Sequence, residues 1–430
     1  VPSFLIFHYR SCSLIFCILL ASEIEAFIPR ECKLKIPRSC RCRFPDRPLV
    51  SCRGNYRDVP TFPKPNLFDR QNIHSLDLSH NRISHIGSDV CEYCEGIKRL
   101  DLSHNRITKV MRHDFFKSSW RYFLEYLDLS YNEMHGADMT GLANLESLKT
   151  LKLDHNRMMM IESDTLPRMV NLEMLTLNNN WLFLFNLTKV HPKVFHLSVL
   201  PLSRISLPSG IEELVITRSF GIFDHPVNVD SSTFKYVALE SCGLNASAIV
   251  NSGFFEDTPD LKHLSLKSNK LSSSDLENFA GLMTQVNDIE YLDLSRNEIT
   301  EVLVDMFQSL GKLKHLDLSN NRIIRIDWKF LASLPNLEFL DLGGNNIEYS
   351  VGMKDAVLRL IKLKSFSIGD NPFNCACDDL RDLYELIKMS LQPPHLIGYS
   401  QIMHALKCNT PEDHKDENIL HYFDKNCKMQ

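Results

Sequence analysis

The sequence lacks the features that would indicate an enzyme or a nucleic-acid binder. It has 48 Lys and Arg against 53 Asp and Glu, so neither sign of charge selects a partner and no generically basic nucleic-acid surface is expected. It contains no phosphate-binding glycine loop, no HExxH motif and no GxSxG motif, the patterns that nucleotide-binding enzymes, metalloproteases and hydrolases need. We therefore expect no enzyme activity, no cofactor and no metal site.

Long apolar runs are also scarce. One short run, Ser13–Ala21, is preceded by His8 and Arg10 and followed by Ile24–Ala26, which places a small residue where cleavage would occur. This run is too short to cross a bilayer, which takes about 20 apolar residues, and its layout is typical of a secretory signal peptide. We assign residues 1–26 to that signal and expect a secreted chain without a membrane span. A buried core segment or a signal anchor is the alternative.

The sequence instead repeats one phrase, with apolar residues at positions 1, 4, 6 and 11 and Asn at position 9. Apolar residues at positions 4 and 6 alternate with polar ones, which predicts a short strand with one buried face. One copy cannot cover that face, so successive copies should stack into a parallel sheet around a shared core. Eleven clear copies, mostly 24 to 28 residues apart, begin at Ile73, Ile97, Leu124, Leu148, Leu172, Phe234, Leu261, Ile289, Leu313, Leu337 and Leu363.

These copies resemble leucine-rich repeats. The resemblance implies an α/β repeat fold, a curved solenoid shaped like a horseshoe with its parallel sheet on the concave face, over residues 67–371. The Asn at position 9 is expected to satisfy backbone groups that the turn leaves unpaired, and Cys242 takes its place in one copy. The phrase decays across residues 183–233, where two degenerate copies begin at Val194 and Ile211. These are divergent repeats, or else a break in curvature or a loop that takes part in binding.

Most cysteines gather at the two ends of the repeats, where a solenoid must cover its core. The arrangement resembles the cysteine-capped extracellular members of the family, such as Toll-like receptor ectodomains and Slit-type proteins. It places an N-terminal cap at residues 27–66 and a C-terminal cap at 372–430, with a cap helix over Asp378–Met389. Four cysteines alone allow three pairings. The family pattern implies the pairs Cys32–Cys42, Cys40–Cys52, Cys375–Cys408 and Cys377–Cys427.

Two short motifs fit an extracellular setting. Cys91 and Cys94 form a Cys-x-x-Cys in the connection after the first repeat strand. We favour a local disulfide over a redox pair or half of a zinc site, because no second Cys-x-x-Cys follows at zinc-finger spacing. Asn186 and Asn245 begin Asn-x-Ser/Thr sequences and are expected to carry glycans in a secreted protein.

The strand positions that face away from the core predict a binding surface. Position 3 carries rings and position 5 carries acids, and parallel strands lie about 4.8 Å apart, so each column should be continuous on the concave face. The acids have a structural alternative, because LDLSxN is the commonest form of the repeat. His80, His104 and His155 at position 8 are expected to be solvated rim residues, with pH sensing as the alternative. The candidate ligand-binding residues are Tyr126, Tyr236, His263, Tyr291, His315, Phe339, Asp293, Asp317 and Asp341.

Two kinds of function fit this arrangement. The first is an extracellular, non-enzymatic scaffold that binds a protein ligand or receptor through its concave face. The second is a structural or adhesive matrix protein that associates through its flank or its ends, as a homodimer in one version. A truncated ectodomain of a Toll-like transmembrane receptor is a further expectation. The partner in every case is an extracellular or cell-surface protein.

Overall fold

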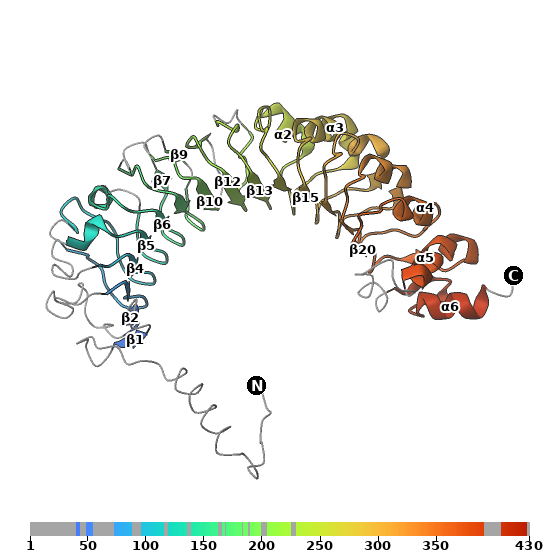
Figure 1. Cartoon of the computed structure of the whole chain (residues 1–430), viewed down its shortest axis with the longest axis horizontal. Helices are drawn as coiled ribbons and strands as arrows, with labels where there is room; N and C mark the ends of the chain where they lie inside the picture. The colour runs from blue at the N-terminus through green and yellow to red at the C-terminus, as the bar shows by residue number, and fades with distance from the viewer. Residues whose placement is uncertain are drawn as a thin grey trace, which may run out of the picture.

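The chain forms an open arc (Figure 1). The structure, a computed structural model, describes residues 40–43, 49–54, 73–87, 96–115, 119–135, 139–161, 166–167, 169–182, 184–187, 190–198, 204–224, 229–390 and 406–427. The proposed signal peptide, Cys32, Cys91 and Cys94 lie outside these residues.

A 15-stranded sheet lines the inner side of the arc. Its first two strands are antiparallel, and every later pair is parallel. In each of the eleven clear copies the strand begins two residues after the first position of the repeat, as the alternation of apolar residues predicts; β10 is in register with them through the pair Val194 and Met174, so Val194 stands at position 3. In order the strands are β1 (Arg41–Arg43), β2 (Leu49–Ser51), β3 (Ser75–Asp77), β4 (Arg99–Asp101), β5 (Tyr126–Asp128), β6 (Thr150–Lys152), β8 (Met174–Thr176), β10 (Val194–Ser198), β12 (Glu213–Thr217), β13 (Tyr236–Glu240), β14 (His263–Ser265), β15 (Tyr291–Asp293), β17 (His315–Asp317), β19 (Phe339–Asp341) and β20 (Ser365–Ser367).

The degenerate copies from Val194 and Ile211 supply β10 and β12, so the sheet runs through this segment without interruption. Both copies therefore keep the parallel strand pairing of their neighbours, as divergent repeats do. They keep apolar side chains on the core side, where Phe195 and Leu197 are fully buried. Their strands are five residues long rather than three, which adds backbone hydrogen bonds where the Asn is missing.

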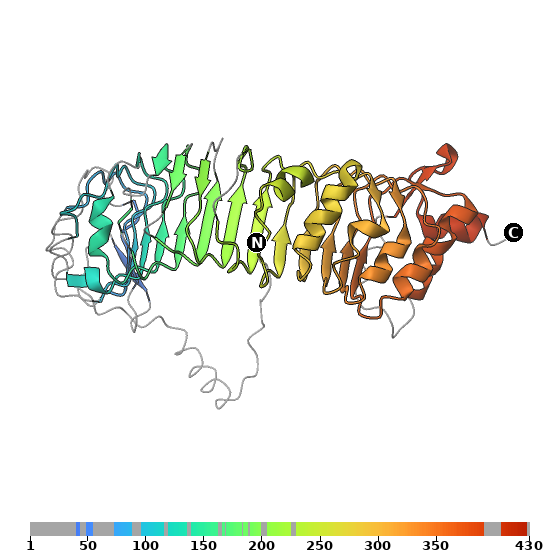
Figure 2. The same cartoon turned by 90° about the horizontal axis from the view of Figure 1, so that it is seen from above.

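The outer side of the arc carries short elements that cover the core (Figures 1 and 2). The first half has a small sheet of β7 (Met160–Ile161), β9 (Leu184–Asn186) and β11 (Arg204–Ser206). The second half is richer in helices, as Figure 2 shows. Its outer elements are α2 (Ala246–Asn251), η4 (Ser273–Asp275), α3 (Leu276–Gln285), β16 (Glu301–Val302), η5 (Val304–Met306), β18 (Arg325–Ile326), η6 (Trp328–Ser333) and α4 (Met353–Leu358), while η2 (Ser119–Tyr122) and η3 (Thr140–Asn144) lie earlier in the chain.

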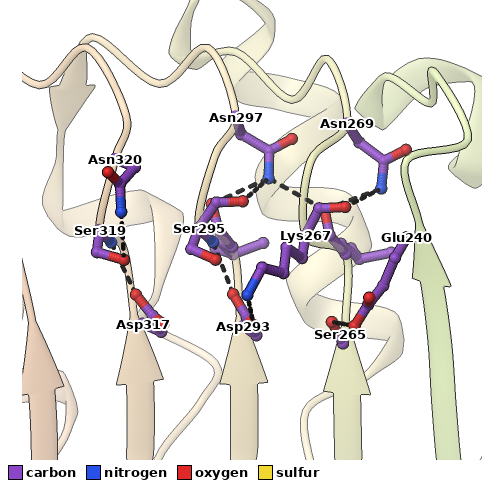
Figure 3. Close-up of polar contacts among 12 residues, drawn as sticks. Glu240, Ser265, Lys267, Asn269, Asp293, Ser295, Asn297, Asp317, Ser319 and Asn320 are labelled. Carbon is purple, nitrogen blue, oxygen red and sulfur yellow. Dashed lines mark hydrogen bonds and ion pairs between the residues drawn. The ribbon is translucent and has the colours of Figure 1, made fainter. Parts of the chain in front are cut away.

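The Asn residues at position 9 form a buried ladder that joins neighbouring repeats. Asn297 shows the pattern: its Nδ2 donates to the carbonyl oxygens of Leu294 at 2.9 Å and of Leu266, one repeat earlier, at 3.0 Å. Its Oδ1 accepts from the backbone N–H of Leu271 at 3.1 Å. Figure 3 shows Asn269 and Asn297 side by side in this ladder. Each amide thus satisfies groups that stacking would otherwise leave buried and unpaired.

Cys242 occupies the ladder position of its own repeat, as the sequence predicts. It is buried and is the one free cysteine among the described residues. Its Sγ lies 3.5 Å from the carbonyl oxygen of Ile216 and 3.3 Å from that of Glu240. A thiol can donate weakly to a carbonyl but cannot replace both functions of an amide. Burial raises the pKa of this thiol to about 11, so it stays protonated at neutral pH.

Position 2 of the repeats forms a charged rim along one edge of the sheet. From β4 onward, the residues that directly precede the strands of the 15-stranded sheet are, in chain order, Lys98, Glu125, Lys149, Glu173, Lys193, Glu212, Lys235, Lys262, Glu290, Lys314, Glu338 and Lys364. Several neighbours of opposite sign form ion pairs: Glu125 lies 2.7 Å from Lys98 and 3.3 Å from Lys149. Glu212 likewise lies 3.4 Å from Lys193 and 2.7 Å from Lys235. Exposed pairs of this kind each contribute little, about 0–1 kcal/mol.

Disulfide bonds link cysteines within the cap at each end of the solenoid. The bonds are Cys40–Cys52, Cys375–Cys408 and Cys377–Cys427, which are three of the four pairs that the family pattern implies. Cys42 is also disulfide-bonded, and its implied partner Cys32 lies outside the described residues. The end of the solenoid is covered by α5 (Cys377–Ser390), β21 (Phe373–Asn374), β22 (Cys408–Thr410), η8 (Glu412–His414) and α6 (Ile419–Asn426).

The cap helix α5 lies where the sequence predicts a helix. Asp378 and Asp379 lie in its first turn, where carboxylates interact favourably with the helix dipole. Leu380, Leu383 and Ile387 share one face and are buried. This apolar face covers the end of the solenoid core. On the neighbouring turn, the ring of Tyr384 stacks on Phe423 of α6 at 4.0 Å, so the two cap helices pack against each other.

Replacement of one buried Asn tests how much the Asn ladder contributes to the stability of the fold. Asn297→Ala leaves the buried N–H of Leu271 unpaired and removes one of the two amide donors to the carbonyl oxygens of Leu266 and Leu294, so we expect the free energy of unfolding to fall by about 3 kcal/mol. Asn297→Cys keeps a weak donor, as Cys242 does, and should lie between wild type and Asn297→Ala. Urea unfolding followed by circular dichroism measures both variants. If Asn297→Ala were as stable as wild type, the Asn ladder would not stabilise the stacked repeats.

Candidate functional site: the concave face

The parallel register places position 3 of successive repeats in one column on the concave face. Tyr236 pairs with His263, His263 with Tyr291, Tyr291 with His315, and His315 with Phe339. We call these five residues the aromatic ladder. Position 4 of each copy points into the core, as buried Leu264 and Leu292 show, so position 3 must point to the opposite face of the sheet.

The rings of the aromatic ladder are in contact with one another. Ring centroids lie 4.1 Å apart for Tyr236 and His263, 3.8 Å for His263 and Tyr291, and 4.3 Å for Tyr291 and His315, all stacked. The last pair, His315 and Phe339, is wider at 5.4 Å and tilted by 36°. The next strand carries Ser365 at the same register. Phe339 therefore ends the ladder beside a small residue and is 40% exposed.

Stacking keeps the imidazoles of the aromatic ladder neutral. Burial lowers the pKa of His263 from 6.5 to about 4, and the nearby His315 adds to this effect. Burial also lowers the pKa of His315, against the opposing effect of Asp317, Asp293 and Asp341. Burial and the neighbouring acids raise the pKa of Tyr291 to about 12. At neutral pH the ladder is therefore an uncharged strip whose ring edges carry hydrogen-bonding groups.

The acids of position 5 lie beside this strip and also cap turns. Asp293, Asp317 and Asp341 each accept the backbone N–H two residues later through Oδ1, at 2.8 Å. Figure 3 shows the first two of these contacts, with Asp293 also near Lys267; its Oδ2 lies 3.9 Å from Lys267 Nζ. Burial raises the pKa of Asp317. This hydrogen bond gives each Asp a structural role, and the second carboxylate oxygen adds negative charge beside the ladder.

Tyr126 does not join the aromatic ladder. Four strands, β6, β8, β10 and β12, separate its strand from β13. The Arg99 guanidinium lies 3.4 Å from its ring centroid, a cation–π contact. Its hydroxyl donates to Asp128 at 3.0 Å. Of the predicted ring column, the structure thus brings five members together and leaves Tyr126 in a separate polar cluster.

A second stack of rings, which sequence reasoning missed, lies at position 8 along the loop edge. His80, His104, Tyr131 and His155 stack with centroids 3.9, 4.1 and 4.0 Å apart; we call them the rim stack. The three histidines lie at the rim and none is buried, but the prediction from the sequence did not include the contact that strand spacing creates between their flat side chains. Burial lowers the pKa of His80, with His104 and Arg53 adding to the effect.

The rim stack had a sequence signal. Its residues adopt left-handed φ values of 57°, 55°, 54° and 52° in chain order, a conformation in which His and Asn are enriched. Tyr131 is less typical of such a position, and it bridges His104 and His155. A flat side chain at position 8 in four consecutive copies, from Ile73 to Leu148, was the available clue.

Among the residues that the structure describes, no group of three or more His, Cys, Asp or Glu could hold a metal ion. Within the same part of the chain, no helix has the length and apolar character to cross a membrane.

Stability at acid pH tests the neutral state of the aromatic ladder. Folding holds the pKa of His263 near 4, whereas the unfolded chain titrates near 6.5. Between these values the unfolded state binds more protons, so the free energy of unfolding falls as pH drops from about 6.5 towards 4. His263→Gln removes this term, and its melting temperature should fall less between pH 7 and pH 4.5 than that of wild type. Exposed His135→Gln is the control, and equal slopes for all three proteins would contradict the prediction.

Comparisons with known proteins agree with the repeat assignment. The family profile described as "Leucine rich repeat" matches residues 71–119, 123–182 and 288–347, and a second profile of the same description matches residues 260–282. No curated protein sequence matches the chain.

The fold resembles solved repeat structures at low identity. The crystal structure of the mouse RP105/MD-1 complex superposes with a TM-score of 0.53 at 19% identity, over 81% of this chain and 53% of that chain. The present chain thus spans about half of that protein. The leucine-rich repeat domain of APL1B is 20% identical over 80% of this chain and 92% of that chain, with a TM-score of 0.46. The repeats, the 15-stranded sheet and the family profiles show that the chain contains leucine-rich repeats, which form a curved solenoid with disulfide-bonded ends.

Proposed function

We propose that the chain is an extracellular recognition scaffold that binds a protein ligand or receptor through its concave face. Leucine-rich repeat proteins are generally non-enzymatic scaffolds, and the terminal disulfides favour an oxidising compartment, either secreted or at the cell surface. The mouse neighbour is described as a complex of two proteins. That match covers only about half of the neighbour. The chemistry of this chain's own surface is therefore the basis for proposing a protein partner.

The aromatic ladder is the observation that carries this proposal. Its stacked rings are held by neighbouring backbone strands, so binding costs little side-chain entropy. Tyr and Phe supply contact area with few rotatable bonds, and aromatic residues are enriched where interfaces bind most strongly. Asp293, Asp317 and Asp341 beside the ladder favour a partner surface that carries Lys or Arg. The fitting partner is a protein surface with an apolar centre and a basic margin.

The extracellular setting gives roles to other parts of the chain. We propose the signal peptide over residues 1–26, the caps over 27–66 and 372–430, the repeats over 67–371, and a local Cys91–Cys94 disulfide. Asn245 is exposed at the N-terminus of α2, where its Oδ1 accepts from the backbone N–H of Ala248 at 2.8 Å. That contact leaves its amide nitrogen available for a glycan. Asn186 is the last residue of β9, and the structure does not describe its side chain.

Removal of the ladder rings tests the binding proposal. The full chain is used to screen a panel of immobilised extracellular domains, and the affinity of each partner is measured by surface plasmon resonance. The triple variant Tyr291→Ala, His315→Ala, Phe339→Ala should weaken binding by at least about 100-fold, since each anchor ring contributes roughly 1–2 kcal/mol. The control, Phe123→Ala with Tyr349→Ala, removes exposed rings outside the ladder. Unchanged affinity in a folded triple variant would move the site elsewhere.

A second copy of the chain is one protein that could occupy the ladder. Sedimentation velocity of the full chain over a range of concentrations tests this version, with the triple ladder variant run in parallel. If the ladder binds a second copy, wild type should shift to a dimer as concentration rises and the variant should remain a monomer. A wild-type monomer at every concentration excludes self-association and leaves the heterologous partner.

A further inference from the structure

The rim stack forms a ridge between two hollows on the loop edge of the concave face. The first hollow, of about 660 Å³, extends from Ser103 to Ser241. The second, of about 650 Å³, lies on the other side of the ridge. His104, Tyr131, His155 and Asn179 line both hollows. This ridge is separate from the aromatic ladder, none of whose residues line either hollow.

The central strands contribute short polar side chains to the first hollow. Ser198 and Thr217, at the ends of β10 and β12, lie on its floor together with Asn178. The degenerate copies therefore do contribute a surface feature, although they do not break the sheet. Volumes of about 300–1,000 Å³ are those of sites that hold small molecules or short oligomers.

The chemistry of the first hollow is polar and nearly balanced in charge. Three carboxylates, Asp128, Asp154 and Glu240, face two cations, Lys152 and Arg218. This balance disfavours polyanions such as nucleic acids or sulfated polymers, which need excess positive charge. Few apolar groups line the hollow, so a lipid or the apolar anchor of a peptide would find no pocket there. Hydroxyls, amides and carboxylates predominate, and these groups exchange hydrogen bonds with hydroxylated ligands.

The polar groups are already held in place. Asp154 accepts from the Thr176 hydroxyl at 2.6 Å and from the backbone N–H of Asn178 at 2.7 Å. Asn179 Nδ2 and His155 Nε2 lie 3.0 Å apart. Glu240 accepts from the Ser265 hydroxyl at 2.7 Å. Prior ordering of this kind lowers the entropy that a ligand must overcome on binding.

The ridge supplies the apolar contact that such a ligand also needs. Tyr131 is 44% exposed, and its hydroxyl forms no hydrogen bond with the described residues. Stacking between His104 and His155 fixes the ring, so its edge and hydroxyl face outward along the border of both hollows. Tyr combines rigid apolar area with a polar tip, which suits a ligand that has hydroxyl groups at its edges and C–H groups on its faces.

We propose that this hollow and ridge form a second binding site, which takes a neutral oligosaccharide. Sugar hydroxyls hydrogen-bond to Asp128, Asp154 and Arg218, and the C–H face of a sugar ring packs against Tyr131. Such a site discriminates against ligands that lack hydroxyls, because its own polar groups would then be desolvated and unpaired. It works independently of the protein-binding function proposed for the aromatic ladder.

The test uses the full chain, treated with an endoglycosidase so that its own glycans cannot compete. The protein is screened on an array of neutral oligomers of glucose, mannose and N-acetylglucosamine, with sialylated and sulfated oligosaccharides as charged comparators. We expect saturable binding of at least one neutral series and weaker binding of the charged ones. No binding of any neutral series, or a preference for the sulfated sugars, overturns the proposal.

Variants then locate the site by calorimetric titration with the best neutral hexasaccharide. Tyr131→Ala and Arg218→Gln should each weaken binding about tenfold, the loss of one good contact. His315→Ala, on the aromatic ladder, should leave sugar affinity unchanged. Circular dichroism establishes that each variant is folded. Unchanged affinity in both Tyr131→Ala and Arg218→Gln overturns the assignment, as does loss of binding in His315→Ala alone.

Discussion

The spacing between neighbouring parallel strands, about 4.8 Å, is the constraint on which the rest of this structure depends. The buried Asn ladder holds repeats at that spacing, because each amide bonds carbonyls of two consecutive copies, as Asn297 does. The spacing is also close to the contact distance of two flat rings. Any column of aromatic side chains on this sheet therefore becomes a stack, which explains both the aromatic ladder and the rim stack.

The central part of the chain shows how the solenoid accommodates a weak repeat signal. Where Asn is missing, the strands lengthen to five residues and pair over their full length, as Val194–Ser198 does with Glu213–Thr217. The core rows remain apolar through Phe195 and Leu214. Backbone pairing over these longer strands thus takes over part of what the Asn side chain does in the other repeats. On the surface, the ends of these two strands line the hollow beside the rim stack.

The sequence predicts the strands, the buried rows and the aromatic ladder, because all three follow from position within a repeated phrase. It does not predict the rim stack, because the direction of a side chain at position 8 depends on a left-handed backbone angle, as at His104. The polar hollow combines residues from separate repeats, including the divergent ones that contribute Ser198 and Thr217. The terminal pairings come from family resemblance, since counting alone leaves three alternatives. Features that depend on position within one repeat can therefore be predicted from the sequence. Features formed by residues of several repeats can be found only once the structure shows how the repeats align.

The charged rim limits how a solenoid of this kind can change its length. Its signs alternate from Lys98 to Lys235 and again from Lys262 to Lys364. Insertion or loss of two repeats preserves that alternation, whereas a change of one repeat places like charges on adjacent strands. Lys235 and Lys262 are such a junction, on β13 and β14. The rim thus consists of two blocks of alternating charge that meet between Lys235 and Lys262, and repeats added in pairs within either block leave its alternation and net charge unchanged.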